Sequence, residues 1–550
     1  MKKKGPNFIE QIIDGDISRG FKKDDLRFRF PPEPNGYLHI GHLKAICLNF
    51  NLGEKYGAPV NLRFDDTNPE KEAKEYVDAI KNDILWLGYK WNKECYASDY
   101  FEQLYNWALV LIEKDLAYID SQSSEDIANQ KGTPTKEGKA SPHRDRDKEE
   151  SLKVFKEMYN GEHKQGEHVL RAKINMSSPN MLMRDPVIYR VMDSNHHRTG
   201  DRWKIYPMYD WTHGESDYIE QVSHSLCTLE FEPHRELYDW FLDSISPLEG
   251  IRPKQREFSR LNLSYTITSK RNLAKLVEEG VVDGWDDPRM PTISGLRNRG
   301  YTPESLKSFA LTVGISKREN VIDVSLLEFC VRTHLNEEAP RAMAVLDPLK
   351  ISIINYKENK EESVNFDINP QKPGQGKREV LFSKNIYIER EDFQENPEEG
   401  FFRLSLGEEV RLKNAYIIKA KNIIKNEKGQ ITEVECEYDE KSKSGTNTEE
   451  SNRKVKATIH WVSAETAVEA TINIYDRLFK VAEPGKSQDL LSEVNENSLE
   501  IKSAKVEPYL ASAKDGDHFQ FQRLGYFVRT NNKKTLEFNK TVGLRDGWKK

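Results

Sequence analysis

The chain has few cysteines and no long hydrophobic run. Its 550 residues include only Cys47, Cys95, Cys227, Cys330 and Cys436, with no CxxC pair, so neither a disulfide framework nor a cysteine zinc site is expected. No stretch approaches the ~20 apolar residues that a membrane span needs, and the mean hydropathy is −0.76. The basic start MKKKGPNF is not followed by the apolar segment of a secretion signal. These absences predict a cytoplasmic protein without a membrane partner.

Two common nucleotide-binding patterns are also missing. The chain has neither a GxGxxG run nor a P-loop, so a dinucleotide or Walker-type site is not supported. The net charge is −7, from 83 Lys and Arg against 90 Asp and Glu. Nucleic acid is not excluded by this charge, because binding depends on local patches. At roughly 150 residues per domain, the length predicts three or four domains.

Strand and helix patterns alternate over the first hundred residues. We expect a strand at 26–30, a helix at about 38–56, a strand at 59–64 and a helix ending near 88. This order predicts a parallel sheet with right-handed crossovers. Ligands of such sheets bind beyond the carboxyl ends of the strands, where His39, His42 and Asp65 fall. One of Asp65 and Asp66 is expected to cap the helix that follows.

The rest of the chain changes texture twice. Residues 100–207 are irregular and read as an inserted domain, after which a strand at 205–211 is expected to resume and to end near Tyr209 and Asp210. Residues 271–337 are mainly helical in pattern. Beyond Arg341, strands are expected at 410–419, 431–438 and 455–462, with a turn at 427–430. Regular strands with short polar turns predict β-barrels or sandwiches.

The most informative motif is His39-Ile40-Gly41-His42, which follows a strand and a Pro/Gly turn at the start of a helix. Two imidazoles beside helix N-terminal amides suit a polyphosphate. Each can donate to phosphate oxygens that gain charge in a transition state. Two histidines at this spacing can also arise by chance, and a zinc site would need further ligands. The surrounding string PPEPNGYLHIGHLK favours the nucleotide interpretation.

A second motif, Thr268-Ser269-Lys270-Arg271, lies far downstream, before a helical pattern. A small hydroxyl beside two cations can clamp a leaving pyrophosphate. Most basic tetrapeptides are solvated surface, so this motif gains its weight from its pairing with the histidine motif. Among the other candidates, Asp65 could bind an ammonium group and the Tyr209 phenol a polar substrate.

In the order PPEPNGYLHIGH, RFDDTNP, SLCTLEF and TSKR, these motifs resemble a class I aminoacyl-tRNA synthetase, and more narrowly the glutaminyl-tRNA synthetase family. TSKR is then a variant of the KMSKS loop. The resemblance covers essentially the whole chain and implies an α/β fold class. The implied parts are a Rossmann-like catalytic domain (1–99 and 208–270), an inserted acceptor-binding domain (100–207), a helical subdomain (271–338), and two anticodon-binding β-barrels (339–550, the distal one at about 391–475).

Three other functions are compatible with parts of this pattern. A β-barrel-type glutamyl-tRNA synthetase shares both nucleotide motifs. Such enzymes resemble this chain, but they usually have an arginine at the position where this chain has Cys227. Without that arginine, a substrate carboxylate would be poorly compensated, and a neutral amide is the better guest. A synthetase-like RNA-binding protein without catalysis would not need both motifs intact. A small-molecule adenylyltransferase would leave the C-terminal β-structure unexplained.

The resemblance also implies roles for individual residues. It implies that His39, His42 and Lys270 are catalytic. It implies that Asp65 binds the substrate ammonium and that Tyr209 binds both the ammonium and the amide. Arg29 and Gln255 would orient Tyr209 and a water, and Cys227 would lie beside the amide. The implied ATP contacts are Glu33, Pro34, Asn35, His39, Ile40, Gly41, His42, Leu43, Lys44, Ala45, Thr228, Arg260, Leu261, Thr268, Ser269 and Lys270. The implied tRNA contacts are Ser316, Lys317, Arg318, Arg341, Arg403 and Arg411.

Three positions depart from the family pattern. Thr268 replaces a usual methionine, and Pro233 and Pro134 stand where an aspartate and a leucine act on the acceptor stem, so acceptor recognition is expected to differ in detail.

The implied reaction joins L-glutamine to tRNA(Gln) through an adenylate. ATP would enter with Mg²⁺ as a substrate complex, without a structural metal in the protein, and the protein is expected to be a monomer.

Overall fold

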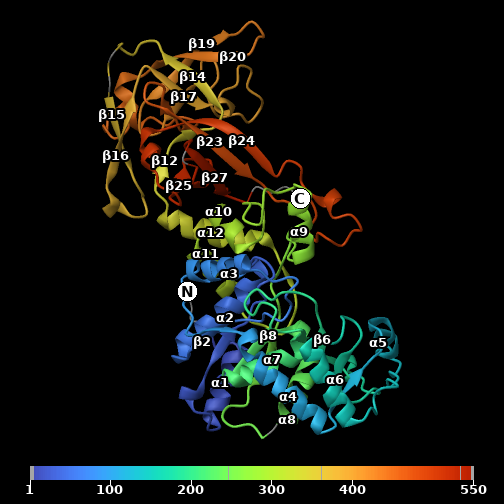
Figure 1. Cartoon of the computed structure of the whole chain (residues 1–550). Coiled ribbons are helices and arrows are strands. Elements are labelled where there is room, and N and C mark those ends of the chain that lie inside the picture. Colours follow the sequence, from blue (N-terminus) through green and yellow to red (C-terminus); the bar gives the residue numbers. More distant parts are fainter. Residues whose placement is uncertain (1–4, 246, 359, 361, 533, 547–550) are drawn as a thin grey trace. The chain divides into compact units, whose positions relative to one another are not determined.

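The computed structural model of the protein describes residues 5–245, 247–358, 360, 362–532 and 534–546 (Figure 1). The chain divides into two compact units. The first unit consists of Met1–Asn262 and Ala310–Ile322, and the second of Leu263–Phe309 and Asp323–Lys550. Within the described residues, every helix is too short or too polar to cross a membrane.

A parallel sheet opens the first unit. Strand β1 (Phe28–Phe30) pairs with β2 (Val60–Phe64), and β2 pairs with β3 (Glu94–Tyr96). Every residue of β1 and β2 is buried, as expected for strands covered on both faces. Helices α2 (Ile40–Tyr56) and α3 (Lys74–Trp86) connect these strands, which confirms the predicted alternation. A second parallel pair, β8 (His224–Thr228) and β9 (Lys254–Phe258), and helix α1 (Phe8–Ser18) complete this part.

The inserted segment forms its own antiparallel sheet in the order β4 (Ala117–Asp120), β5 (Val169–Ala172), β6 (Val187–Val191) and β7 (Ile205–Pro207). Its helices are α4 (Phe101–Glu113), α5 (Ser124–Gln130) and α6 (Lys148–Asn160). The predicted strand at 205–211 is wrong in its extent and its sheet. It stops at Pro207 and pairs with β6, and α7 (Tyr209–Ile219) begins two residues later, followed by α8 (Arg235–Ser244). Buried strand and helix-start residues have the same apolar pattern over so short a run.

Helices and two curved sheets make up the second unit. The helices are α9 (Lys270–Glu278), α10 (Ile293–Asn298), α11 (Pro303–Val313, which runs into the first unit), α12 (Val324–Glu338) and α13 (Glu449–Asn452). One sheet has the order β12 (Arg341–Ala342), β25 (His518–Phe521), β26 (Gly525–Arg529), β27 (Glu537–Val542), β23 (Val468–Tyr475), β24 (Leu499–Val506) and β13 (Ala344–Val345). The other has the order β21 (Thr458–Ile459), β18 (Glu409–Leu412), β19 (Ile417–Lys425), β20 (Ile431–Tyr438), β14 (Pro348–Ile353), β17 (Asn385–Glu389) and β22 (Val462–Ser463). The second unit also has a hairpin of β15 (Glu362–Asp367) and β16 (Lys377–Phe382). The short strands β10 (Asn262–Leu263) and β11 (Val321–Ile322) lie where the chain passes from one unit to the other.

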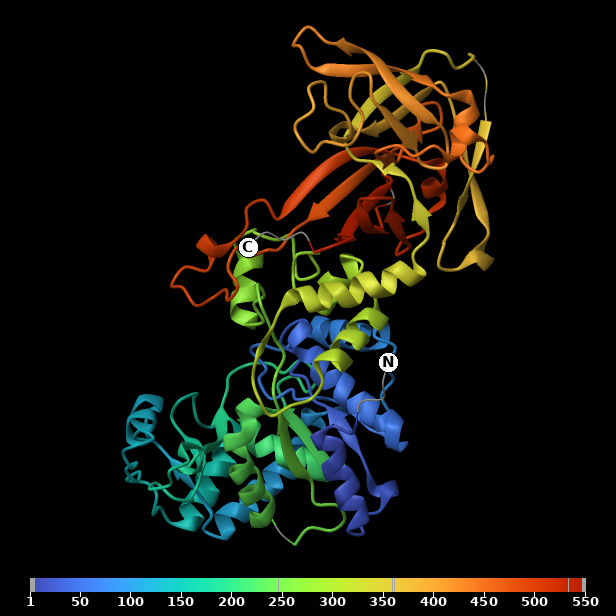
Figure 2. The same cartoon turned by 180° about the vertical axis from the view of Figure 1, so that it is seen from behind.

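Both curved sheets close into barrels. The opposite edges of the first sheet, β12 and β13, are separated in the chain only by Met343, and those of the second, β21 and β22, only by His460 and Trp461. Two edges joined by so few residues lie side by side, so each sheet curls round on itself and covers its own edges. Figure 2 shows these sheets in yellow to red from behind. Barrels in the C-terminal part are confirmed.

Three details of the C-terminal prediction need correction. The strand expected at 455–462 is two short strands, β21 and β22, separated by His460 and Trp461. The strand expected at 410–419 is two strands, because the chain turns between them at Asn414, whose φ is +56°. The barrel that contains them, here called the distal barrel, also takes β14 and β17 and ends at Ser463, whereas β23 belongs to the other sheet. Its strands therefore extend from 348 to 463 rather than over the expected 391–475.

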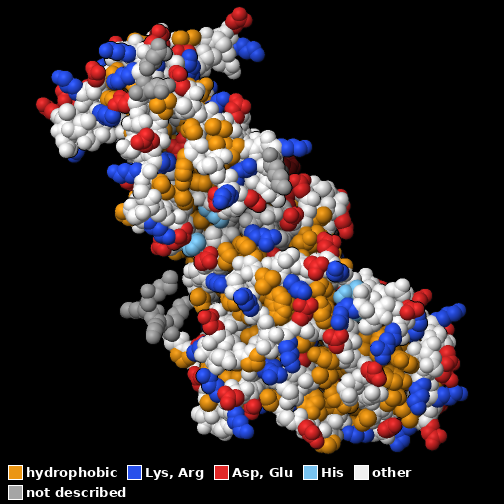
Figure 3. Space-filling view, turned by 60° about the vertical axis from the view of Figure 1, so that its left-hand side comes forward, with side chains coloured by type: hydrophobic (Ala, Val, Ile, Leu, Met, Phe, Trp, Pro, Cys, Tyr) orange, Lys and Arg blue, Asp and Glu red, His pale blue; other side chains and the backbone are white. Residues whose placement is uncertain are grey.

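Charged side chains of both signs are interspersed over the face seen in Figure 3.

Candidate active site

The histidine motif forms a reciprocal cap at the start of α2. His39 is the N-cap residue, and its Nδ1 accepts a hydrogen bond from the Gly41 amide at 3.2 Å. The His42 Nδ1 accepts from the His39 amide at 3.1 Å, and the two ring centroids are 3.9 Å apart. Because both Nδ1 atoms are acceptors, each neutral ring carries its proton on Nε2. Two Nε2–H donors thus accompany the amides of a helix N-terminus, where anions are favoured.

Asp65 lies directly beyond β2 in a buried ionic network. Its Oδ1 accepts from the Arg63 Nε at 2.8 Å, and Arg63 also donates from Nη1 to Asp217 at 2.7 Å. The Asp65 Oδ2 has no hydrogen-bond partner within the part of the chain that the structure describes. Burial alone would raise the pKa of Asp65, but the Arg63 guanidinium holds it below its ordinary value. Asp65 is therefore an ionised carboxylate with one oxygen available to a cation.

Tyr209, at the first turn of α7, packs beside this carboxylate. Its ring stacks on His213 with centroids 4.9 Å apart and also contacts Phe231. His213 Nδ1 lies 3.7 Å from the Asp65 Oδ2, and burial lowers the pKa of this histidine. Burial and the Asp65 charge raise the pKa of the Tyr209 phenol, so the phenol stays neutral. Sequence reasoning missed His213, which no local motif distinguishes.

Arg29, on β1, is fully buried and its charge is already compensated. Its Nε and Nη2 donate to Asp217 at 3.0 and 3.2 Å, and its Nη2 donates to Ser225 at 2.6 Å. Its Nη1 donates to the Leu226 carbonyl at 2.9 Å, directly before Cys227 in β8. Asp217 was also missed, since it lies 188 residues from its partner Arg29.

Cys227 and Gln255 come from the adjoining strands β8 and β9. Cys227 is half-buried, and burial raises the pKa of its thiol, so it is uncharged. The Gln255 side chain is 2% exposed and donates from Nε2 to the Phe231 carbonyl at 2.8 Å and to Glu257 at 2.9 Å. The structure thus brings Asp65, Tyr209, Arg29, Cys227 and Gln255 into one neighbourhood of the first unit.

The predicted ATP contacts of the first unit have different exposures. Arg260 is exposed, and its Nη1 lies 3.5 Å from the Glu230 Oε2. The Glu230 Oε1 accepts a hydrogen bond from the Thr228 hydroxyl at 2.8 Å. Leu261 is 2% exposed, and the remaining predicted contacts, at 33–35 and 39–45, surround the start of α2.

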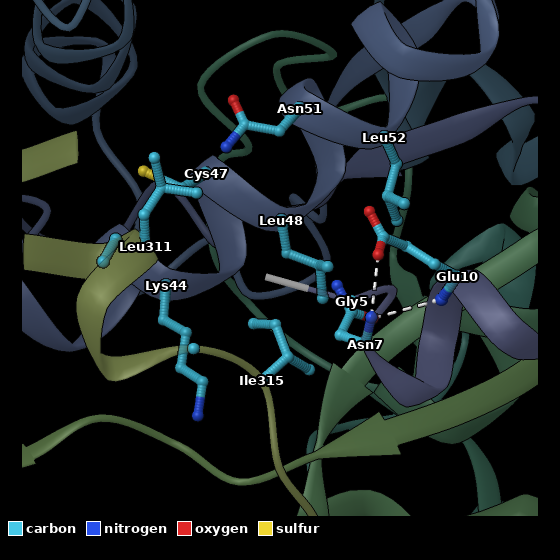
Figure 4. Close-up of a pocket in the computed structure, with 12 residues that line it drawn as sticks. Gly5, Asn7, Glu10, Lys44, Cys47, Leu48, Asn51, Leu52, Leu311 and Ile315 are labelled. Atoms are coloured by element: carbon cyan, nitrogen blue, oxygen red, sulfur yellow. Dashed lines mark hydrogen bonds between the residues drawn. The ribbon is translucent and has the colours of Figure 1, made fainter. Parts of the chain in front are cut away.

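Lys44 lies on another face of α2. Its side chain is buried and Nζ donates to the Ser259 Oγ at 2.8 Å, and burial lowers the pKa of this amine to about 8. Lys44, Cys47, Leu48 and Asn51 line a cavity of about 250 Å³ together with residues 5–10 and 310–315 (Figure 4). The Lys44 amine is therefore engaged with Ser259 beside this cavity, and its predicted contact with ATP stays a prediction.

The TSKR motif belongs to the second unit. Lys270 is the first residue of α9, Ser269 is its exposed N-cap residue, and Thr268 is half-buried. Ile267, just before them, is buried in a cluster with Leu273, Leu276 and Phe479, which anchors the motif. Two cations at a helix N-terminus oppose the helix dipole, an arrangement that an anion would relieve.

The predicted tRNA contacts differ in availability. Lys317 and Arg318 are exposed, and Arg403 is partly exposed beside Glu391 and Asp392. Arg341 is 4% exposed and donates to the Asn336 and Ala339 carbonyls at 2.7 and 2.5 Å. Arg411 donates to the carbonyls of Ser442, Ser451 and Arg453. The guanidinium groups of Arg341, which is buried, and Arg411, which is half-buried, both donate to backbone carbonyls.

Among the described residues, one group of side chains could hold a metal. Ligand atoms of Asp66, His196 and His197 lie within 4.8 Å of one another. Asp66 accepts twice from Ser98, however, and the His196 Nε2 donates to the Asp66 carbonyl at 2.9 Å while its Nδ1 accepts from two amides. These bonds hold Asp66 and His196 in place within the protein. The expectation that Asp65 or Asp66 caps the next helix is wrong for both, since the N-cap of α3 is Ala73, which makes no side-chain cap bond.

Comparisons with known proteins show similarity along nearly the whole chain. The catalytic-domain model of the "tRNA synthetases class I (E and Q)" matches residues 25–337, and two anti-codon binding domain models of the same group match 339–439 and 458–530. "Glutamine--tRNA ligase" of Vibrio vulnificus (strain YJ016) is 53% identical over 548 residues, covering 99% of this chain and 98% of that protein. The protein of the same name from Cronobacter sakazakii (strain ATCC BAA-894) is 52% identical with the same coverage. A solved glutamate tRNA ligase from Elizabethkingia meningosepticum has a TM-score of 0.43 and 16% identity, covering 57% of this chain and 70% of that one. The chain belongs to the class I tRNA synthetases of the E and Q group.

Proposed function

We propose that this chain ligates L-glutamine to tRNA(Gln) at the expense of ATP, giving glutaminyl-tRNA, AMP and diphosphate. Relatives that are 52–53% identical over nearly the whole chain have the name "Glutamine--tRNA ligase". The chain also carries both the catalytic and the anti-codon binding domains of its family. We further propose that it acts in the cytoplasm as a monomer.

In the first step, the glutamine carboxylate attacks the α-phosphorus of ATP in line and pyrophosphate leaves. Asp65 would bind the substrate ammonium through its unpartnered Oδ2, which places the carboxylate for attack. The Nε2–H groups of His39 and His42 would donate to phosphate oxygens as charge develops on them. Lys270 and Ser269 would bind the leaving pyrophosphate. Mg²⁺ would enter with ATP and neutralise phosphate charge.

In the second step, a terminal adenosine hydroxyl of the tRNA attacks the activated carbonyl and releases AMP. By class I resemblance this is the 2′-hydroxyl. Neither step demands a strongly perturbed catalytic base, because positioning and charge stabilisation supply the rate.

The observation that carries the choice of amino acid is the charge state around Cys227. This residue is an uncharged thiol, and the nearest buried cation, Arg29, is already bound to Asp217 by two nitrogens. A glutamate side chain would be desolvated there without a free cation, whereas the neutral Tyr209 phenol can bond an amide.

Competition between labelled glutamine and glutamate on one tRNA tests the proposal. We expect a large kcat/KM preference for glutamine, and a shift toward glutamate in Cys227→Arg, with Cys227→Ser as the control of similar size. Efficient charging of glutamate by the unmodified protein would instead favour the glutamyl-tRNA synthetase alternative.

A further inference from the structure

A groove of about 820 Å³ runs along one face of α1 in the first unit. Its first wall is one face of α1, at helical spacing from Phe8 to Asp16, together with Arg19, the C-cap residue of that helix. Its second wall consists of Arg256 and the segment 316–318. Below we name it the α1 groove.

The α1 groove has a local excess of positive charge. Arg19, Arg256, Lys317 and Arg318 line it, and Asp16 is the one carboxylate among its described lining residues. Asp16 is already bonded to Arg19. The Arg19 side chain is 71% exposed. The whole chain has a net charge of −7, and the face seen in Figure 3 has charged side chains of both signs. The excess is therefore a feature of this place, and it suits a polyanion.

The middle of the α1 wall is open to close approach. Gly15 lies on this face, and the three nearest side-chain atoms that a Cβ built there would meet belong to the Arg19 guanidinium, the first at 3.4 Å. Packing therefore does not require a glycine, and glycine weakens a helix interior relative to alanine. The absent side chain leaves room for a backbone to lie against the helix. On the same wall, the Lys317 Nζ lies over the Phe8 ring, 5.3 Å from the ring centroid.

The opposite wall is held in place. The Ser259 amide donates to the Ser316 carbonyl at 2.8 Å, and the Ser259 Oγ lies 3.1 Å from the Ser316 Oγ. The Ser316 Oγ also donates to the Arg318 carbonyl at 3.0 Å. These bonds fix the segment that carries Lys317 and Arg318, so less conformational entropy is lost when a ligand binds.

We propose that the α1 groove binds the sugar–phosphate backbone of the tRNA, and that Arg19 and Arg256 contact phosphates together with Lys317 and Arg318. This inference rests on the proposed function, which makes a tRNA the substrate. An RNA backbone offers the repeated negative charge that four cations on two walls require.

Charge inserted at position 15 gives the sharpest test. Gly15→Glu and Gly15→Gln introduce side chains of the same size, and the new carboxylate of Gly15→Glu would also pair with Arg19 four residues later. We expect Gly15→Glu to raise the KM for tRNA at least fivefold over Gly15→Gln, with kcat at saturating tRNA within twofold. Equal KM values in the two variants would overturn the proposal.

Salt dependence tests the two new arginines. For Arg19→Gln and Arg256→Gln, the slope of log affinity for tRNA against log salt should fall by about 0.7–0.9 for each cation removed. Arg19→Lys and Arg256→Lys should retain it, and so should Arg252→Gln, which removes an arginine paired with Asp239 and Asp243 outside the groove. If the salt slopes of Arg19→Gln and Arg256→Gln both equal that of an active parent protein, the proposal that this groove binds tRNA is refuted, while the proposed function still stands. A parent protein that charges no tRNA with glutamine would refute the proposed function instead.

Discussion

At the scale of a single residue, Lys270 occupies a position that is electrostatically unfavourable for the helix but suited to binding pyrophosphate. It stands at the N-terminal end of α9, where a cation opposes the helix dipole by ~0.3–1 kcal/mol. We expect Lys270→Ala to lower the rate of adenylate formation ~10²–10³-fold, because its charge acts on the leaving pyrophosphate in the transition state. Thermal stability should stay equal or rise. Rapid-quench kinetics and thermal unfolding measure both, with Lys275→Ala in the same helix as the control; a normal rate at saturating ATP would contradict the role.

Glu72 is a second residue whose environment makes a prediction. Its side chain is 2% exposed, Oε1 accepts from the Asn68 amide at 2.7 Å, and burial raises its pKa to about 8. Between about pH 4.5 and pH 8 the native protein keeps this proton while the unfolded chain releases it, so this group makes stability fall as pH rises, by at most ~1.4 kcal/mol per pH unit.

We expect Glu72→Gln to remove that fall, so its stability advantage over the parent protein should grow from pH 5 to pH 8. Urea unfolding at several pH values measures the difference. A difference that does not change with pH would show that Glu72 ionises normally in the native state.

At the scale of an element, the start of α2 combines a cap with two donors, and substitutions can separate these roles. Asparagine caps helices as well as any residue but lacks the Nε2–H, whereas alanine does neither. We expect His39→Asn to keep the unfolding free energy and to lose ~10²-fold in adenylate formation. His39→Ala should lose activity and also ~0.5–2 kcal/mol of stability. If His39→Asn is fully active, the imidazole serves only as a cap.

At the scale of the whole molecule, Arg341 joins the helical part of the second unit to its barrels. Its guanidinium binds the last carbonyls of α12, and its own backbone starts β12. Such carbonyls lack partners within the helix. We expect Arg341→Ala to destabilise the second unit by ~1–3 kcal/mol and to speed hydrogen exchange at the end of α12 and in β12, but not in β1–β3. A residue that only contacts RNA would leave exchange unchanged and weaken tRNA binding alone.

Local patterns determined much of this protein from its sequence. The strands and helices of the first sheet were predictable because each buried strand and amphipathic helix has its own periodicity. The histidine motif was predictable as a helix start because its neighbours along the chain make the cap. The barrels were predictable as a class, because regular strands and polar turns occur along 341–542.

Only the tertiary structure decided which distant groups meet. Arg29 finds Asp217 across 188 residues, and His196 finds the Asp66 carbonyl across 130. The same holds for β7, which joined the inserted sheet, and for β14, which joined the distal barrel. The buried position of Arg341, expected at an RNA surface, follows from the carbonyls that α12 presents to it. The physical reason is common to all of them: burial makes an unpaired charge or strand edge costly, and the partner that removes this cost is chosen by folding in space rather than by position along the chain.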